Sequence, residues 1–278
     1  MNKVLVIITN FMRPANVSRI IEAFAAQSVP CTIKVVDNSP RGAPLAEWWH
    51  YPAEKVADIW RFTENHGPPC RFAPALLDHT HPYTLFYDDD LLPGPLAVEN
   101  LLEVAEKLNN NFANLGMIGR RFRPPQDPRN GRGRYLPRNI ERLQTPVAVD
   151  MTCRTHFVKT CDVRHAINFK WDLIDAAGKD ISSHVFVHDD MLLCLGIQHA
   201  TGLGTYIIPA CEPDRSLKIA DLPDAHAVSI RRGDSEMGGY KVHLNERSEL
   251  VDLAERVGWK SRWATLETEM RGKADIFT

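Results

Sequence analysis

Short apolar runs alternate with amphipathic stretches through the first 110 residues, and this alternation constrains the fold more than any other feature of the chain. The apolar runs cover residues 4–9, 33–36, 59–62 and 83–87, and the amphipathic stretches cover residues 16–27, 69–77 and 95–108. Runs that are apolar at every position suit strands buried on both faces of a sheet. We therefore predict an α/β domain with a mostly parallel sheet and helices on both of its faces.

The second half of the chain is less regular, and its most distinctive stretch is rich in arginine. Residues 120–142 carry eight Arg, four Pro and two Gly with little periodicity, and they predict a long basic loop. Beyond this loop we expect strands at residues 146–151 and 204–210 and helices at residues 188–199 and 245–257. Because no internal repeat or low-complexity linker divides the chain, residues 1–278 are predicted to form one elaborated domain.

Composition narrows the class of protein. The 278 residues carry 33 Lys and Arg against 35 Asp and Glu, and this net charge of −2 gives no sign of a polyanionic partner. Six cysteines without a C-x-x-C pair or a zinc-binding spacing indicate reduced thiols in an intracellular protein. We find no signal-peptide pattern and no apolar stretch of the roughly 18 residues that span a membrane, so we expect a cytoplasmic protein.

Three consecutive carboxylates, Asp88, Asp89 and Asp90, directly follow the expected strand at residues 83–87. Adjacent carboxylates repel one another, and a bound cation relieves this repulsion. Alternate residues of an extended chain point to the same side, so Asp88 and Asp90 together suit a hard divalent ion such as Mg²⁺ or Mn²⁺. The alternative is a solvated acidic turn that caps the next helix.

A second acidic pair, Asp189 and Asp190, opens the expected helix at residues 188–199. Helix capping and the helix dipole favour aspartate at this position, so a structural role alone explains the pair. Beside a metal site, however, a second carboxylate is what a sugar transfer needs to remove the proton of a hydroxyl group. Asp189 and Asp190 are therefore both candidate catalytic carboxylates.

Polar residues also follow the first two expected strands: Thr9, Asn10 and Arg13 after the first, and Asp37 after the second. In doubly wound sheets, ligands bind beyond the carboxyl ends of the strands, so a nucleotide base and ribose are the candidate ligands here. The chain has neither a G-x-G-x-x-G motif after the first strand nor a P-loop, which argues against dinucleotide and P-loop chemistry. Ordinary turn chemistry is the alternative for Asp37.

Several of these motifs, in this order, resemble those of family 2-type glycosyltransferases. They are Asn10-Phe11-Met12-Arg13-Pro14, Val35-Val36-Asp37-Asn38-Ser39, Asn65-His66-Gly67 followed by Arg71, Phe86-Tyr87-Asp88-Asp89-Asp90-Leu91-Leu92-Pro93, and His188-Asp189-Asp190-Met191-Leu192. The resemblance covers residues 1–110 well, residues 149–202 loosely, and the basic loop not at all. His188 departs from the family pattern.

The resemblance implies a GT-A fold, a nucleoside-diphosphate-sugar donor, with UDP as the favoured nucleotide, and a Mn or Mg ion. It makes residues 1–119 the donor half, 120–145 the basic loop and 146–278 the acceptor half. It also assigns roles to single residues: Asp37 to the base, Asn65 and Arg71 to the nucleotide side, Asp88 and Asp89 to the ribose or metal, Asp90 to the metal, and Asp190 to the general base. His243, as a further metal ligand, and Arg247 would belong to a C-terminal segment that closes over the diphosphate; ordinary surface positions are the alternative for both.

The charge of the basic loop indicates what kind of acceptor the protein could bind. Its eight arginines face only two acids, which leaves a local charge of +6. Arginines at this density, with the aromatic Phe122 and Tyr135, suit phosphate contacts and base stacking. The expected acceptor is either an anionic glycan or glycolipid, or a hydroxymethylated pyrimidine in DNA of the kind found in phage genomes, and the candidate contacts are Arg129, Arg132 and Arg134. A solvated loop paired with surface acids is the alternative.

Two other classes of function stay open at this point. A sugar nucleotidyltransferase also combines an α/β sheet with a metal, but it would need a glycine-rich loop after the first strand, and residues 9–14 contain no glycine. A non-catalytic module that binds nucleotide sugars or nucleic acid would keep ligand binding without turnover. The motifs also leave open whether a transfer inverts or retains the sugar configuration.

Overall fold

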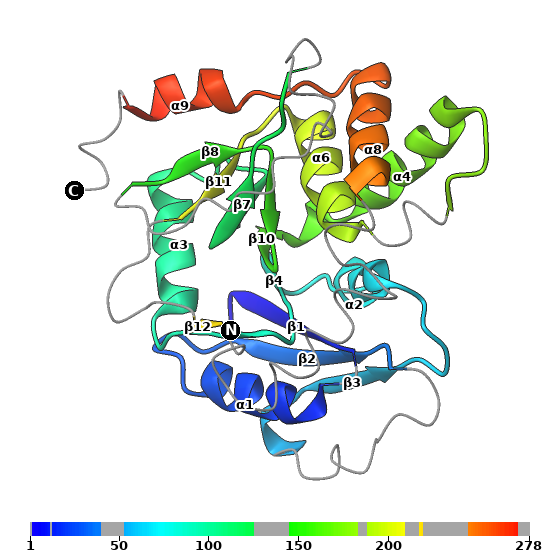
Figure 1. Ribbon diagram of the computed structural model, residues 1–278. Helices are drawn as coiled ribbons and strands as arrows, with labels where there is room; N and C mark the ends of the chain where they lie inside the picture. Colours follow the sequence, from blue (N-terminus) through cyan, green and yellow to red (C-terminus); the bar gives the residue numbers. More distant parts are fainter. Residues whose placement is uncertain are drawn as a thin grey trace.

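An eight-stranded sheet runs through the centre of the molecule (Figure 1). The computed structural model describes residues 2–11, 13–39, 53–124, 145–182, 188–208, 217–218 and 244–271. Within these residues the strand order is β3-β2-β1-β4-β10-β6-β11-β8. The strands are β1 (Val4–Asn10), β2 (Thr32–Asp37), β3 (Asp58–Arg61), β4 (Tyr83–Tyr87), β6 (Asn114–Gly116), β8 (Val147–Val149), β10 (Thr155–Lys159) and β11 (Thr205–Ile207).

One half of the sheet is parallel and the other half is mixed. β1 pairs in parallel with both β2 and β4, and β2 pairs in parallel with β3. β10 lies antiparallel between β4 and β6, while β11 is parallel to β6 and antiparallel to β8. This sheet, with helices on both faces, confirms the predicted Rossmann-like α/β class.

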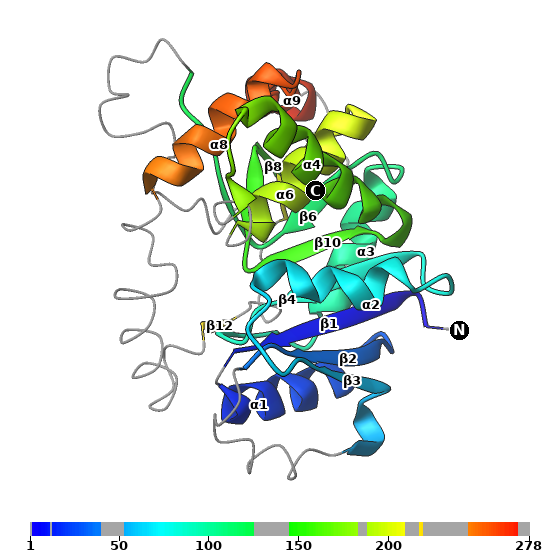
Figure 2. The same cartoon turned by 90° about the vertical axis from the view of Figure 1, so that its right-hand side faces the viewer.

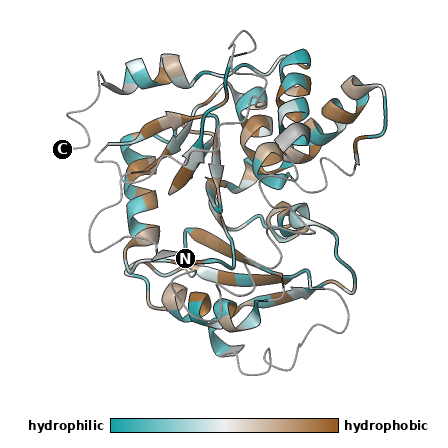
Figure 3. Ribbon diagram, viewed as in Figure 1, coloured by the Kyte–Doolittle hydropathy of each residue, from teal (hydrophilic) through white to brown (hydrophobic). Residues whose placement is uncertain are grey.

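The central strands β1 and β4 are buried on both faces because their side chains enter two hydrophobic cores in turn. Leu5 and Ile7 of β1 belong to one core, and Val4, Val6 and Ile8 belong to the other. All five side chains are fully buried. Figure 3 shows strands in mainly hydrophobic colours and helices with a hydrophilic side. The uninterrupted apolar runs of the sequence therefore reflect burial on both sides of the sheet.

Helices cover both faces of the sheet (Figures 1 and 2). The core that contains Leu5 is completed by α2 (Ala73–Leu76), α4 (Arg164–Ala177), α6 (Asp189–Thr201) and α8 (Leu244–Arg256). The core that contains Val4 is completed by α1 (Pro14–Ala25), α3 (Ala97–Lys107) and α9 (Trp263–Arg271). Among the residues described, no helix combines the length and apolarity that crossing a membrane requires.

α6 and α4 pack closely because α6 carries Gly196 where the two helices meet. A Cβ atom at this position would lie 2.8 Å from the carbonyl oxygen of His165 and 3.1 Å from the Cα atom of Ala166. α6 begins with Asp189 and Asp190, so this contact also fixes the position of the second acidic pair.

Several elements differ from the sequence predictions. The expected helix at residues 69–77 is a 3-10 helix, η3 (Pro68–Phe72), followed by the single turn of α2. The expected strand at residues 146–151 is two short strands, β8 and β9 (Met151–Cys153). Neither β10 nor α4 was predicted, although β10 joins the parallel half of the sheet to the mixed half.

The first residues of the arginine-rich stretch are part of the fold. β7 (Ile118–Arg120) pairs with β9. The guanidinium of Arg121 lies 4.2 Å from the ring centroid of Trp263. Phe122 is buried against Trp259, so it cannot stack on a base, and our expectation for this residue was wrong. The candidate acceptor contacts further along the stretch lie outside the described residues: Arg129, Arg132 and Arg134.

Candidate active site

Polar residues from three neighbouring strands meet at the carboxyl edge of the parallel half of the sheet. Asn10 ends β1 and Asp37 ends β2, and the two residues are paired in register. Asp88 follows β4, and its backbone amide donates a hydrogen bond of 3.0 Å to the carbonyl oxygen of Arg154, directly before β10. The structure thus brings together residues that the sequence placed after separate strands.

Asn10 and Asp37 belong to a buried polar network at this edge. The side-chain amide of Asn10 donates to Asp37 Oδ1 and to Ser39 Oγ, at 2.9 Å each, and the backbone amide of Ser39 donates to Asp37 Oδ1 at 3.1 Å. These bonds hold the ends of β1 and β2 in place before any ligand binds. The neighbouring Thr9 Oγ1 is buried and has no hydrogen-bond partner within the described ranges, so it keeps an unused polar group.

The turn at Asn65 and Gly67 directs Arg71 into the site. Asn65 Oδ1 accepts hydrogen bonds from Asn38 Nδ2 at 2.8 Å and from the backbone amide of Gly67 at 2.9 Å. Gly67 has a φ of 70°, in the left-handed region that favours glycine, and η3 starts directly after it. Arg71 is buried in the last turn of η3.

Arg71 joins the two acidic motifs. Its guanidinium donates to Asp88 Oδ1 at 2.6 Å and to Asp190 Oδ1 at 3.2 Å, and it forms a further ion pair with Asp189. Burial by itself lowers the pKa of Arg71, but the three carboxylates outweigh burial and raise it. Arg71 is therefore a permanent buried cation that both acidic motifs share. Asp88 lies 17 positions and Asp190 119 positions further along the sequence.

Asp89, in the middle of the first acidic run, binds the turn between β1 and α1. Its carboxylate accepts a hydrogen bond from the backbone amide of Phe11 at 2.8 Å and pairs with the guanidinium of Arg13 at 2.5 Å. Its carbonyl oxygen accepts a hydrogen bond from Asn16 Nδ2 at 2.9 Å. Asp89 and Arg13, which the sequence placed beside the nucleotide, therefore bind each other within the protein.

Asp88 and Asp90 keep carboxylate oxygens that suit a metal ion. Asp90 Oδ1 is buried and has no hydrogen-bond partner in the described chain, while Asp90 Oδ2 lies 3.5 Å from Arg154. Burial, opposed by the charge of Arg71 and reinforced by the neighbouring carboxylate of Asp90, raises the pKa of Asp88 to about 7. A divalent cation would supply the missing partner of Asp90 and relieve this repulsion.

The described residues offer no third protein ligand beside Asp88 and Asp90. These residues contain no group of three or more His, Cys, Asp or Glu side chains arranged to hold a metal ion. His243, the further ligand expected from the sequence, lies outside them.

The second acidic pair lies in the first turn of α6, a position that aspartate prefers because of the helix dipole. Asp189 is buried, whereas 27% of the Asp190 side chain is exposed. Asp190 Oδ1 lies 2.9 Å from Nε2 of His156. Burial raises the pKa of Asp190, but the charges of His156, Arg71 and Arg247 outweigh burial and hold it below its usual range. Asp190 is therefore ionised at neutral pH.

His188, the residue that departs from the family pattern, connects α6 to α8. It is buried directly before α6. Nε of Arg247 donates to Nδ1 of His188 at 3.4 Å, and Nε2 of His188 lies 3.4 Å from Glu246. Arg247, which the sequence placed over a diphosphate, thus lies close to the second acidic pair.

Sequence reasoning missed His156. It lies inside β10 and is fully buried. A single histidine in a short strand is no recognisable motif, and Asp190 lies 34 positions further along the chain. Only the pairing of β10 with β4 brings the imidazole to the acidic edge.

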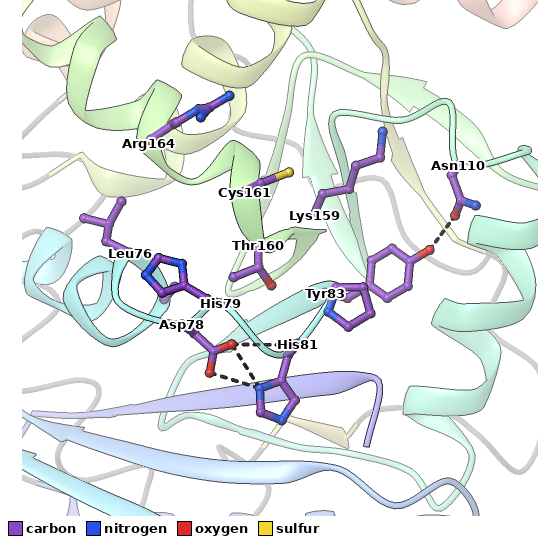
Figure 4. A pocket seen from close by; sticks show the side chains of 12 residues that line it. Leu76, Asp78, His79, His81, Tyr83, Asn110, Lys159, Thr160, Cys161 and Arg164 are labelled. Carbon is purple, nitrogen blue, oxygen red and sulfur yellow. Dashed lines mark hydrogen bonds and ion pairs between the residues drawn. The ribbon is translucent and has the colours of Figure 1, made fainter. Parts of the chain in front are cut away.

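A separate pocket of about 620 Å³ lies at the opposite edge of the sheet (Figure 4). Its lining includes Tyr83, where β4 begins, and Lys159, where β10 ends. Four of its lining residues are basic, namely His79, His81, Lys159 and Arg164, and one, Asp78, is a carboxylate.

Comparisons with known proteins give similarity in fold at low sequence identity. No model of a protein family matches the chain, and no curated protein matches it. S. aureus TarS is 14% identical with a TM-score of 0.47; the match covers 91% of this chain but only 43% of TarS. The 1–349 portion of the same protein is 16% identical with a TM-score of 0.46, over 90% of this chain and 71% of that portion.

A third solved structure is the mannosyltransferase PcManGT from Pyrobaculum calidifontis in complex with GDP-Man and Mn²⁺. It is 17% identical with a TM-score of 0.48, and the match covers 98% of this chain and 80% of that one. At this level of similarity, the reaction has to be inferred from the side chains of the site itself.

Proposed function

We propose that the protein is a metal-dependent glycosyltransferase that moves a sugar from a nucleoside-diphosphate sugar to a hydroxyl acceptor. The observation that carries the proposal is the bridge made by Arg71, which binds Asp88 at the end of β4 and Asp189 and Asp190 at the start of α6. The bridge puts the expected donor-binding motif and the expected base in one site. A module that only binds a ligand has no need of the second motif.

The donor nucleotide is assigned to the ends of β1 and β2. Asn10 and Ser39 hold Asp37 in a fixed position, so its carboxylate is ready to accept a hydrogen bond from the base. UDP is the nucleotide that the resemblance favours. Asp88 and Asp90 would hold a Mn or Mg ion, which neutralises the charge that grows on the departing diphosphate.

Asp190 is the proposed general base. It is ionised because of its cationic neighbours, and its exposed part can reach an incoming hydroxyl group. As the acceptor oxygen attacks the anomeric carbon, its proton passes to the carboxylate of Asp190. A single displacement of this kind inverts the configuration of the sugar.

The acceptor is either a glycan or glycolipid, or a hydroxymethylated pyrimidine in DNA. Arg129, Arg132 and Arg134 support an anionic acceptor. Binding to DNA at low salt that falls steeply as salt rises would favour the DNA base. Unchanged DNA affinity after replacement of these three arginines by alanine would exclude their role.

The proposed function is tested by thermal unfolding with a panel of nucleotide sugars, with and without Mn²⁺. A ligand that binds the folded state raises Tm by mass action, and we expect one or two donors to do so in the presence of Mn²⁺. Asp190→Asn should keep this shift and lose turnover by about 100-fold or more. Asp175→Asn, at an exposed position of α4, is the control and should change neither. If no donor shifts Tm, or if turnover survives Asp190→Asn, the proposal is wrong.

A further inference from the structure

His156 is a buried ionisable residue whose position calls for a chemical reason. It lies within β10, opposite Phe86 of β4, and is completely buried. Placing an imidazole there costs free energy unless its nitrogens are hydrogen-bonded. An apolar side chain would suit the same strand position, so the polar contacts of the ring indicate what it does.

Both ring nitrogens of His156 have partners. Nε2 lies 2.9 Å from Asp190 Oδ1, and because a carboxylate oxygen only accepts, Nε2 carries the proton and donates. Nδ1 lies 2.7 Å from Thr152 Oγ1, a hydroxyl oxygen that can accept the second ring proton. The ring is thus held by β9 on one side and directed at Asp190 on the other.

The two oxygens of Asp190 are used differently. Oδ1 accepts from His156 and also from the guanidinium of Arg71 at 3.2 Å. Oδ2 has no hydrogen bond to any residue that the structure describes, and the side chain is 27% exposed. One oxygen is therefore bound to the protein, and the other is available to an incoming group.

We propose that His156 is the positioning residue of the Asp190 general base: it holds Oδ1 so that Oδ2 is presented to the acceptor hydroxyl. The inference rests on the proposed function, because it assigns to Asp190 the proton transfer of the glycosyl transfer. The proton of the acceptor hydroxyl goes to Oδ2, while the hydrogen bond from Nε2 to Oδ1 stays in place throughout.

Charge supports this geometry. Burial by itself lowers the pKa of His156, but Asp190 outweighs burial and raises it to about 10, so the ring is a cation at neutral pH. The groups around Asp190 are cations on three other elements and two neighbouring carboxylates: His156 on β10, Arg71 on η3, Arg247 on α8, and Asp88 and Asp189. Without the imidazolium, the pKa of Asp190 rises and the ionised base is lost at a higher pH.

The first test is kinetic and uses two variants of the full chain. His156→Phe removes both ring nitrogens at similar volume, and we expect kcat to fall about tenfold or more with an unchanged KM for the donor. The acid limb of the pH profile should move to higher pH. His156→Gln returns an N–H donor near the position of Nε2 and should recover part of kcat. His165→Gln on α4 is the control, because its Nε2 lies 3.9 Å from Asp162, away from the base.

The second test needs no activity, and it remains available if His156→Phe does not fold. The imidazole nitrogens are followed by NMR as pH rises, in the wild-type protein and in Asp190→Asn. We expect the wild-type ring to stay protonated well above pH 7, and Asp190→Asn to lower its pKa.

The outcomes separate the inference from the proposed function. If the ring titrates alike in both proteins, or if kcat and the pH profile of the active enzyme survive His156→Gln and His156→Phe, the inference is overturned and the proposed function stands. If the wild-type protein turns over no donor although the pair is seen by NMR, the proposed function is wrong, and the positioning role with it.

Discussion

The two edges of the sheet differ in how their charged side chains are paired, although β4 and β10 run through both. At the carboxyl edge of β4, the two acidic motifs surround Arg71, which is almost completely buried. At the other edge, four of the twelve residues that line an open pocket are basic and one is a carboxylate (Figure 4). At the first edge, one arginine binds three carboxylates. At the second edge, no cation is shared between carboxylates in this way within the described residues.

At the basic edge, Asp78 is bound by its own turn, whereas Lys159 and Arg164 share no carboxylate in the part of the chain that the structure describes. Burial opposes ionisation of Asp78, but hydrogen bonds from His81 and Thr80 outweigh it and lower the pKa of Asp78 to about 2. Lys159 lies over the ring of Phe112, 5.8 Å from its centroid, and Arg164 is exposed at the start of α4. We therefore expect removal of Lys159 or Arg164 to leave the other cation unchanged. The difference between the edges suggests a rule for substitutions. The loss in the free energy of unfolding depends on how many charged partners a side chain binds, more than on how many charges lie nearby.

The largest effect is expected from Arg71→Met. This variant keeps a long side chain but leaves three carboxylates facing one another at a largely buried site. Removing one partner of a buried ion pair costs about 3–5 kcal/mol, and we expect a loss of that size in the free energy of unfolding. Urea denaturation at neutral pH measures it. A loss below about 1 kcal/mol would show that Arg71 does not hold the two motifs together.

The next largest effect is expected from Asp90→Asn on the requirement for metal. The substitution removes one of two carboxylates assigned to the cation while keeping the shape of the side chain. We expect the Mn²⁺ concentration for half-maximal turnover to rise about tenfold or more. Asp78→Asn at the basic edge is the control. Turnover that resists both a chelator and Asp90→Asn would rule out the metal role of Asp90.

A smaller effect is expected in the pH dependence of stability. The fold raises the pKa of His156 from 6.5 to about 10, so the stabilisation from its pair with Asp190 is complete below pH 6.5 and is lost as pH rises through about 10. The difference in unfolding free energy between the wild type and His156→Gln should therefore shrink over this interval. Urea titrations at several pH values measure it, and a difference that does not vary with pH would contradict the charged pair.

The smallest effect is expected from Arg164→Met at the basic edge. The position is exposed, so the free energy of unfolding should change by no more than about 0.5 kcal/mol. The same urea denaturation gives the value beside that of Arg71→Met. Equal losses in the two variants would remove the distinction between the edges.

The acidic edge could largely be predicted from the sequence because its motifs directly follow apolar runs. Asp37 comes at the end of β2, Asp88 follows β4, and Asp190 lies in the first turn of an apolar helix. The links between these motifs could not be predicted. Arg71 is 17 residues from one partner and 119 from another, and only the finished fold brings them together.

β10 escaped prediction for a different reason. Its first two residues, Thr155 and His156, are polar and yet fully buried, and only Phe157 and Val158 are apolar. The hydrophobic pattern of a strand is lost when its polar side chains are satisfied inside the core. His156, which no sequence motif indicates, therefore lies in β10, which no hydrophobic pattern indicates.

Gly196 has a consequence for the reaction as well as for packing. It lies six residues after Asp190, about 9 Å along the same helix. A methyl group at this position would meet the backbone of α4 at 2.8 Å, so one of the two helices would have to shift. A shift of α6 would disturb the contacts of Asp190 with His156 and Arg71. The absence of one side chain thus sets the alignment of the proposed base, and we expect a substitution that touches no reacting group to weaken catalysis.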